Sequence, residues 1–142
     1  MDNAVLEAIK TRRSIRKYKP EQITDEELVQ VLDAGTFAPT GKNTQCPFIV
    51  AVQNPELKEE LVRMNAEIMG TAGDPYYGAP TIVLVFVPTP EMNRNAVQDG
   101  SLVLGTMMLA AHSIGLASCW INREREMFST AHGKALMTRL GV

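Results

Sequence analysis

A cluster of basic residues near the N-terminus is the most chemically suggestive feature of the sequence. The stretch TRRSIRKYKP holds Arg12, Arg13, Arg16 and Lys17, with Ser14 among them, in a chain whose formal net charge is −2. Arginine offers planar pairs of N–H donors that match a phosphate, and a serine hydroxyl adds a further donor. The cluster therefore suggests a phosphate-binding segment, and a solvated basic turn is the alternative reading of such a charge run.

The cysteines and histidines form no recognisable catalytic or metal-binding pattern. Cys46 and Cys119 have no CxxC spacing, and no spacing to His112 or His132 that would build a metal site. We expect both cysteines to be reduced and neither to bind a metal, and no feature supplies Cys46 with the basic partner of a nucleophile. His112 lies in an apolar stretch and is expected to pack in the core.

Nucleotide-binding motifs and hydrolytic groupings are not found either. No GxGxxG follows a predicted strand, and GSLVLGTM at 100–107 has the glycine spacing of a phosphate-binding loop without its lysine. The paired carboxylates of KEEL at 58–61 and REREM at 123–127 are expected on exposed helix faces. The residues therefore do not indicate a hydrolase.

Length and composition are those of an ordinary globular domain. The chain has 142 residues, 45% of them hydrophobic and 21% charged, which is enough to bury a core. Its apolar runs are short for a membrane span, and its N-terminus lacks the apolar region of a signal peptide. An acidic balance argues against a nucleic-acid binder, which needs a broad basic face. We expect one cytoplasmic domain over residues 1–142, with neither nucleic acid nor membrane as a partner.

Helices are predicted wherever apolar residues recur at helical spacing. They are expected at 3–12, 23–35, 54–70, 95–115 and 134–142. Thr24 and Glu27 form a capping box, and Gly35 is expected to end that helix. The helix at 95–115 is apolar on nearly every face, which indicates burial in a core or at a subunit contact, with Gly115 as its C-terminal cap.

Three apolar runs predict strands between these helices. They are FIVAVQ at 48–53, TIVLVFVP at 81–88 and LASCWI at 116–121, and the first follows a polar loop, FAPTGKNTQCP at 37–47. Strands that alternate with helices predict an α/β or α+β sheet covered by helices. The sheet must then bring together the basic cluster, the polar loop and the end of the third run.

Four motifs, in this order, resemble the flavin-dependent nitroreductase family over nearly the whole chain. They are RRSIRKY after a first helix, APTGKNTQ before the first strand, GAPTIVLVF, and DGSLVLGTMMLAAHSIGLASCWI. The resemblance implies an α+β nitroreductase-like fold, with a central, mostly antiparallel sheet flanked by helices. It also implies an intertwined homodimer that binds FMN at the subunit interface.

The resemblance further implies a set of FMN-binding residues, position by position. The segment that holds the phosphate and the pyrimidine edge corresponds to Arg12, Arg13, Ser14 and Arg16. The loop that the partner subunit lays over the flavin corresponds to Pro39, Thr40, Gly41, Asn43 and Gln45. The segment beside the flavin face corresponds to Trp120, Ile121, Asn122 and Arg123, where a backbone N–H of Asn122 or Arg123 would meet N5. Asn65 corresponds to an asparagine that contacts the ring.

The function implied by the resemblance is that of an FMN-dependent oxidoreductase. NADH or NADPH would give electrons to the flavin at N5, and a nitroaromatic, quinone or similar electron-poor acceptor would then take them in a ping-pong mechanism. The flavin carries this chemistry, so no catalytic side chain is expected. A non-catalytic flavin or nucleotide-phosphate binding protein is the alternative.

The end of the sequence departs from the family pattern. The family continues past the last helix into another strand, a GYP-like turn and a tail with a basic residue for the phosphate, whereas this sequence ends at Gly141 and Val142. We therefore expect the C-terminal strand and tail to be absent. Without them, FMN affinity and stability should be lower than in a chain that carries such a tail.

Overall fold

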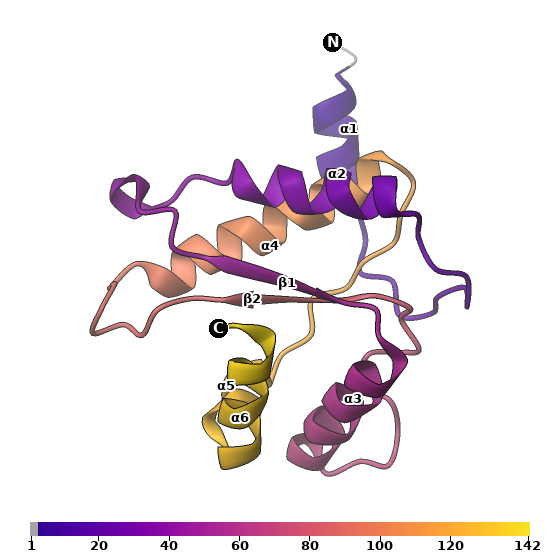
Figure 1. Ribbon diagram of the computed structural model, residues 1–142. Coiled ribbons are helices and arrows are strands. Elements are labelled where there is room, and N and C mark those ends of the chain that lie inside the picture. The colour runs from indigo at the N-terminus through magenta and orange to yellow at the C-terminus, as the bar shows by residue number, and fades with distance from the viewer. Residues whose placement is uncertain (1–2) are drawn as a thin grey trace.

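A computed structural model describes residues 3–142 and shows a two-stranded antiparallel sheet between two layers of helices (Figure 1). The elements are α1 (Ala4–Thr11), α2 (Asp25–Thr36), the short 3-10 helix η1 (Gly41–Asn43), β1 (Phe48–Val52), α3 (Pro55–Met69), β2 (Ile82–Phe86), α4 (Ala96–Ser113), α5 (Glu124–Ser129) and α6 (Ala131–Leu140). Helices α2 and α4 lie on one side of the sheet, and α3, α5 and α6 lie on the other. The expected α+β fold with an antiparallel sheet flanked by helices is confirmed.

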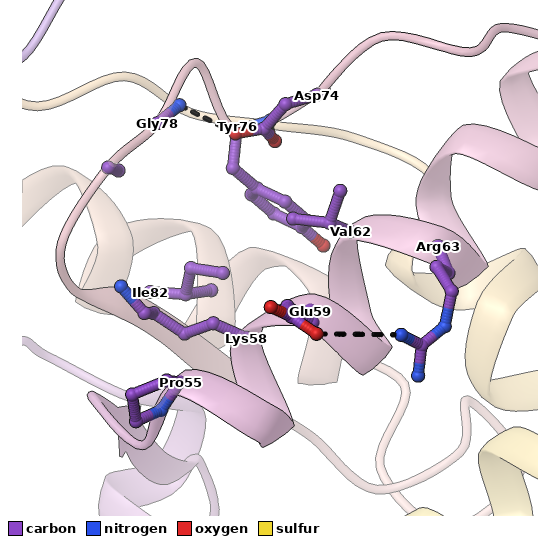
Figure 2. A pocket seen from close by; sticks show the side chains of 10 residues that line it. Pro55, Lys58, Glu59, Val62, Arg63, Asp74, Tyr76, Gly78 and Ile82 are labelled. Atoms are coloured by element: carbon purple, nitrogen blue, oxygen red, sulfur yellow. Dashed lines mark hydrogen bonds and ion pairs between the residues drawn. The ribbon is translucent and has the colours of Figure 1, made fainter.

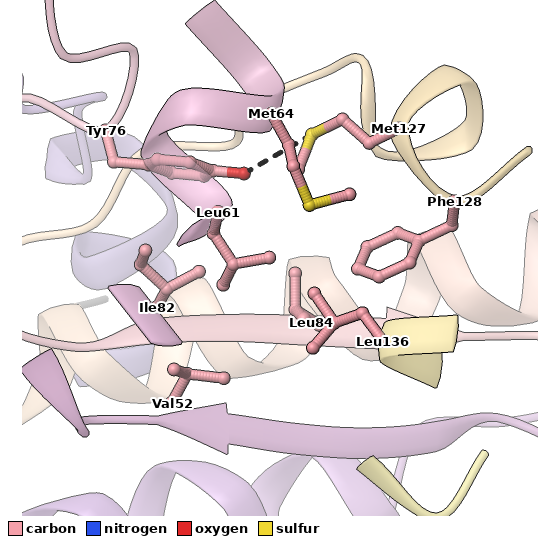
Figure 3. Close-up of a cluster of buried hydrophobic side chains, with 9 residues drawn as sticks. All are labelled: Val52, Leu61, Met64, Tyr76, Ile82, Leu84, Met127, Phe128 and Leu136. Carbon is pink, nitrogen blue, oxygen red and sulfur yellow. Dashed lines mark hydrogen bonds between the residues drawn. The ribbon is translucent and has the colours of Figure 1, made fainter. Parts of the chain in front are cut away.

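The two strands separate two hydrophobic clusters. Successive side chains of a strand point to opposite faces, and in β2 Ile82 and Leu84 face one cluster while Val83 and Val85 face the other. Figure 3 shows the first cluster, made of Val52, Leu61, Met64, Tyr76, Ile82, Leu84, Met127, Phe128 and Leu136. The second lies under α2 and α4. Because a two-stranded sheet is marginal alone, both clusters are needed to hold it.

Helix α2 packs closely on α4 through a glycine. The predicted capping box is present, since the Glu27 N–H donates to Thr24 Oγ1 at 3.2 Å and the Thr24 N–H donates to Glu27 Oε2 at 2.7 Å. The expectation that Gly35 ends this helix is wrong, because α2 continues to Thr36. Gly35 is buried instead, and a Cβ there would lie 2.7 Å from Cγ of Met107. The glycine is required by packing and not by capping.

Helices α1, α3 and α6 confirm the sequence prediction, whereas α5 was not anticipated. Asn54 caps α3 through its side chain, Pro55 begins it, and Gly70 ends it with a left-handed φ of 69°. Helix α5 has 6 residues, which are too few to show a helical period in the sequence.

Residues 116–121 form an extended segment and not the expected third strand. Within the described part of the chain, their one pairing is a parallel bridge of Ser118 with Ser14, where the Ile15 N–H donates to the Ser118 carbonyl at 3.1 Å. A strand requires successive pairs, and no second pair adjoins this bridge among residues 3–142. The bridge nevertheless joins the beginning of the chain to its last third.

Helix α4 is buried on one side only. Its buried residues are Ala96, Asp99, Gly100, Val103, Met107 and Ala111. Val97 and Leu102 are 62% and 48% exposed, so one chain leaves part of this apolar helix uncovered. Gly115 follows the helix with a φ of 85°, as its predicted capping role requires. No helix among residues 3–142 is long and apolar enough to cross a membrane.

Candidate functional site

The bridge between Ser14 and Ser118 places the N-terminal basic cluster beside the predicted segment 120–123. The contact extends to Tyr18, whose pKa burial raises to about 12, with the nearby Cys119 raising it further and Arg16 lowering it. Two of the three segments expected to form the site therefore lie side by side within one chain.

Arg12 has an unusual environment at the end of α1. Its backbone N–H donates to the Ala8 carbonyl at 3.0 Å and closes the last turn of the helix. Its Nη1 is buried and has no hydrogen-bond partner among residues 3–142. A buried donor without an acceptor costs about 1–3 kcal/mol. The arrangement fits a ligand that brings its own acceptor, as the phosphate or a ring carbonyl of FMN would.

The other residues of the cluster differ in their contacts and exposure. Arg13 caps α1, because its Nη1 donates to the carbonyls of Lys10 at 2.6 Å and of Arg12 at 2.8 Å. These bonds satisfy carbonyls that the helix end leaves unpaired. Ser14 and Arg16 are exposed and remain accessible to a ligand. The cluster is thus part helix cap and part candidate binding surface.

His112 joins α4 to α1 and does not pack fully in the core as expected. It is half-buried, and its Nε2 lies 2.9 Å from Oγ1 of Thr11. The Thr11 hydroxyl donates its single proton to the Glu7 carbonyl at 2.7 Å. With that proton on the Glu7 carbonyl, the hydroxyl oxygen accepts from His112 in the tautomer that carries its proton on Nε2. This contact fixes the end of α1 immediately before Arg12.

The predicted covering loop, residues 39–45, is attached to the opposite end of α4. The Gly41 N–H donates to Oδ1 of the buried Asp99 at 2.8 Å. A Cβ on Gly41 would overlap Nδ2 of Asn95 and lie 3.1 Å from its Cβ, so a larger residue there would require the Asn95 side chain or the loop to shift. The other Asp99 oxygen lies 3.8 Å from Sγ of Cys46. A buried carboxylate thus holds the base of the loop.

The loop also carries internal strain and internal hydrogen bonds. The Gln45 N–H donates to Thr40 Oγ1 at 3.0 Å, and its side-chain amide donates to Asn43 Oδ1 at 2.9 Å. Lys42, Asn43 and Gln45 have φ values of 56°, 54° and 50°, which cost energy for residues other than glycine. Pro39 and this polar tip are exposed. The loop is therefore held in a set conformation without a ligand.

Within one chain the covering loop does not face the basic cluster. Asp99 is in the first turn of α4 and contacts the loop, whereas His112 is in the last turn and contacts α1. At about 1.5 Å per residue, these two contacts lie about 20 Å apart along the helix. In Figure 1, η1 and α1 likewise lie near opposite ends of α4. One chain alone does not bring all the predicted site segments together.

Asn65 is fully buried and is connected to the segment that follows Ile121. Its Oδ1 accepts from Nε of Arg123 at 2.7 Å, and its Nδ2 lies 3.2 Å from the Asn122 carbonyl. The structure thus shows Asn65 holding the predicted flavin-facing segment, and a direct contact with a ring stays a prediction.

The segment 120–123 is exposed at one end and anchored at the other. Trp120 is 43% exposed, and Ile121 packs against the cluster of Figure 3. Arg123 has a φ of 88°, a left-handed conformation that is uncommon for residues other than glycine. Such strain persists only where surrounding contacts impose it, and the bond to Asn65 is one of them.

Two carboxylates that the sequence placed on exposed faces are not exposed. The expectation is wrong for Glu124, which is half-buried, accepts from the Tyr76 hydroxyl at 3.1 Å and has its pKa raised by burial. It is also wrong for Glu60, which pairs with His132 at 2.6 Å and with Nη1 of Arg139 at 2.9 Å. Neither contact had a signal in the sequence, because each joins residues far apart along the chain.

A groove of about 490 Å³ between α3 and the following loop contains none of the predicted site residues (Figure 2). Its acidic groups are already engaged. Asp74 accepts from the N–H groups of Tyr76 at 2.8 Å and Gly78 at 2.6 Å, and Glu59 lies 3.8 Å from Arg63. Among residues 3–142, no group of three or more His, Cys, Asp or Glu is placed to hold a metal ion. The site suggested by the sequence is therefore the surface around Arg12 and Trp120.

Comparison with solved structures identifies the fold. A crystal structure of a nitroreductase with bound FMN from Bacteroides fragilis superposes with a TM-score of 0.90 and 34% identity, covering 99% of this chain and 81% of that one. A nitroreductase with bound FMN from Desulfitobacterium hafniense gives a TM-score of 0.88 and 30% identity, covering 99% and 82%.

Sequence comparison gives the same relationship. A Methanothermobacter thermautotrophicus protein, provisionally named NADH dehydrogenase/NAD(P)H nitroreductase, is 33% identical over 118 residues. Those residues are 82% of this chain, which spans 59% of that relative's length. The FMN reductase [NAD(P)H] of Bacillus subtilis is 26% identical over 87% of this chain and 55% of its own. The chain thus spans little more than half the length of these two curated relatives.

The family model described as "Nitroreductase family" matches residues 9–76 and 70–127, a region that includes every site residue named above. Together with the superposed folds, this match confirms the resemblance seen in the motifs, and the chain belongs to the nitroreductase family.

Proposed function

We propose that this chain is an FMN-dependent NAD(P)H oxidoreductase. One structural observation carries the proposal. The Ser14–Ser118 bridge places the basic cluster against segment 120–123, and beside it the buried Nη1 of Arg12 lacks an acceptor among residues 3–142. Family members of similar fold contain bound FMN, which offers phosphate and carbonyl acceptors. The residues present therefore fit the cofactor.

Different residues of the chain bind different parts of FMN. Arg12 and Arg16 supply charged donors for the phosphate end, and the Ser14 hydroxyl supplies a further one. The backbone of Asn122 and Arg123 presents N–H groups toward the ring edge. Trp120, which is 43% exposed, offers a flat apolar surface beside the ring position.

The reaction is assigned to the cofactor, and the chain provides position and shielding. When bound, FMN supplies two-electron redox chemistry between NADH or NADPH and an acceptor. We propose a nitroaromatic, quinone or similar electron-poor acceptor and a ping-pong order, in which donor and acceptor use one pocket in turn. Stacking against the exposed ring and Trp120 would hold a flat acceptor at reacting distance. No side chain of the site is assigned an acid or base role.

We also propose that the functional unit is a homodimer. Helix α1 exposes Val5, Leu6 and Ile9 at 60%, 50% and 56%, and α4 exposes Leu102 at 48%. Apolar residues gathered on neighbouring helices in this way favour a subunit contact. A second copy would also provide the 39–45 loop, which its own chain holds about 20 Å from the Arg12 cluster along α4.

We also propose that the protein is located in the cytoplasm. Cys46 and Cys119 are free thiols in the structure, which suits a compartment where reductants keep thiols unpaired. Fractionation of cells that express the chain, with marker enzymes for each compartment, tests this location.

Anaerobic titration of the purified, FMN-loaded protein tests the function. We expect each of NADH and NADPH, added in separate titrations, to bleach the flavin absorbance to an extent that reveals the preferred donor. Addition of a nitroaromatic or a quinone should then restore the absorbance of the oxidised flavin while the flavin stays bound to the protein. Bound flavin that neither nucleotide bleaches would indicate the non-catalytic flavin-binding alternative, and a protein that binds no flavin would contradict both.

A further inference from the structure

A buried network behind segment 120–123 joins three elements of the fold. The Tyr76 hydroxyl, from the loop after α3, donates to Oε1 of Glu124 at 3.1 Å. Nδ2 of Asn65, from α3, lies 3.2 Å from that hydroxyl and 3.3 Å from the same carboxylate oxygen. Tyr76 is 5% exposed and Asn65 is 0% exposed, so the network is shielded from water. A shielded hydrogen-bond network has few alternative arrangements.

The network contacts the proposed cofactor segment at two points. Nδ2 of Asn65 donates to the Asn122 carbonyl at 3.2 Å, and Oδ1 of Asn65 accepts from Nε of Arg123 at 2.7 Å. The first bond holds the peptide between Asn122 and Arg123, and the second holds the side chain of Arg123, whose φ is a strained 88° just before α5. A residue that alters the position of Asn65 therefore alters the orientation of the Asn122–Arg123 peptide and with it the direction of the Arg123 N–H.

We propose that Tyr76 and Glu124 are positioning residues for the flavin edge, holding Asn65 and through it the backbone at Asn122 and Arg123. The inference rests on the proposed function, since it concerns the same cofactor. It gives a role to two residues that lie outside the four sequence motifs, Tyr76 from the loop after α3 and Glu124 from α5.

If the network only stabilised the fold, a carboxylate at position 124 would be unfavourable, because it lowers the stability of the folded protein. Burial raises the pKa of its carboxyl, with the neighbouring Glu126 also raising it and Arg123 and the Tyr76 hydroxyl lowering it. A raised pKa means that the folded protein binds the proton more tightly than the unfolded chain does. Stability is then lost as the pH rises through the folded-state pKa. An amide at this position removes that penalty and keeps an acceptor oxygen for the Tyr76 hydroxyl.

The test compares Glu124→Gln and Tyr76→Phe with Glu126→Gln, a matched change at an exposed carboxylate on the same helix. The first measurement needs no flavin. In amide NMR spectra of the flavin-free protein, we expect the Asn122 and Arg123 signals to shift in the first two variants and to stay in place in the control. The Glu124→Gln melting temperature at neutral pH should equal or exceed that of the unmodified chain.

The second measurement is flavin binding. We expect the Kd for FMN and the Kd for riboflavin to rise together, by about two- to tenfold, because the ring edge and not the phosphate is affected. The midpoint potential of bound FMN should shift in both variants and not in Glu126→Gln. In the double variant Glu124→Gln/Tyr76→Phe, the fold increase in Kd should be smaller than the product of the two single increases, since both residues act through Asn65.

The outcomes separate this inference from the proposed function. If the unmodified chain binds FMN while both variants leave the amide signals, Kd values and potential unchanged, the positioning role is overturned and the function stands. If Glu124→Gln lowers the melting temperature and leaves the potential unchanged, Glu124 serves the fold alone and the inference fails. A chain that binds neither flavin overturns the function and this inference together.

Discussion

The Nε of Arg123 donates to Oδ1 of Asn65 at 2.7 Å, although the two residues are 58 positions apart in the chain. The bond ties the C-terminal half of α3 to the residue that precedes α5 and helps to hold Arg123 at its left-handed φ of 88°. The geometry of the proposed cofactor segment thus depends on a side chain that is itself fully buried.

Replacement of Asn65 should therefore be more destabilising than an ordinary surface change. In Asn65→Ala, the Arg123 Nε and the Asn122 carbonyl lose their partner and a small cavity remains. We expect a loss of about 2–4 kcal/mol in the free energy of unfolding, measured by urea denaturation. Asn54→Ala, which removes the exposed cap of the same helix, should cost about 1 kcal/mol. Equal losses would show that the buried contacts contribute little.

Arg12→Ala tests the buried Nη1 donor, for which residues 3–142 supply no acceptor. A charge-assisted hydrogen bond contributes about 1.5–3 kcal/mol, so we expect FMN affinity to fall by about tenfold to a hundredfold. Riboflavin, which lacks the phosphate, should bind nearly as before if Nη1 faces the phosphate. Fluorescence titration with both flavins measures the difference, and Arg63→Ala on α3 controls for the lost charge. An equal loss for both flavins would place Arg12 at the ring and not at the phosphate.

Gly41→Ala tests the attachment of the covering loop. The added methyl would overlap Nδ2 of Asn95 and lie 3.1 Å from its Cβ, so the Asn95 side chain or the loop must shift. Such overpacking costs about 1–3 kcal/mol, and FMN affinity should fall by about tenfold. Truncation of the obstacle in the double variant Gly41→Ala/Asn95→Ala should recover most of that affinity. Without such recovery, the effect of the single change would have another cause than the collision.

Leu102→Asp tests the homodimer. Leu102 is 48% exposed in one chain, so a charge there should cost a lone subunit little. At a subunit contact the same charge loses its water, and the dimer should dissociate. We expect sedimentation equilibrium to show a dimer for the unmodified chain and a monomer with weakened FMN binding for the variant. Ile68→Asp on α3, across the sheet, is the control and should stay dimeric. A monomer that binds FMN before any substitution would refute the dimer.

The Glu60 ion pairs predict an acid-dependent contribution to stability. The bonds from His132 and Arg139 hold the Glu60 pKa below its ordinary value of 4.5. A lowered pKa gives stability that is present above the unfolded-state value and is lost as the pH falls through the folded-state value. Glu60→Gln should therefore cost about 0.2–1 kcal/mol at pH 7 and almost nothing once Glu60 is protonated. Thermal melts at pH 7 and at an acidic pH where Glu60 is protonated measure this difference, with the exposed Glu59→Gln as control.

Much of the fold and of the family relationship could be read from the sequence, because local signals carry them. The capping box of Thr24 and Glu27 and the Asn54–Pro55 start of α3 depend on residues within one turn of each other. The family motifs are likewise short and contiguous. Such features need no knowledge of distant contacts.

Only the tertiary structure decided which side chains meet across the chain. Gly35 looked like a helix end because the sequence does not show that Met107 packs against it. Residues 116–121 looked like a strand because their apolar pattern does not reveal that, in the part of the chain that the structure describes, only Ser118 pairs, with Ser14. The network of Asn65, Tyr76 and Glu124 has no local signature either, since its members come from separate elements. A contact between distant residues depends on how helices and sheet pack as a whole, and that packing is a property of the folded chain and not of any short stretch of it.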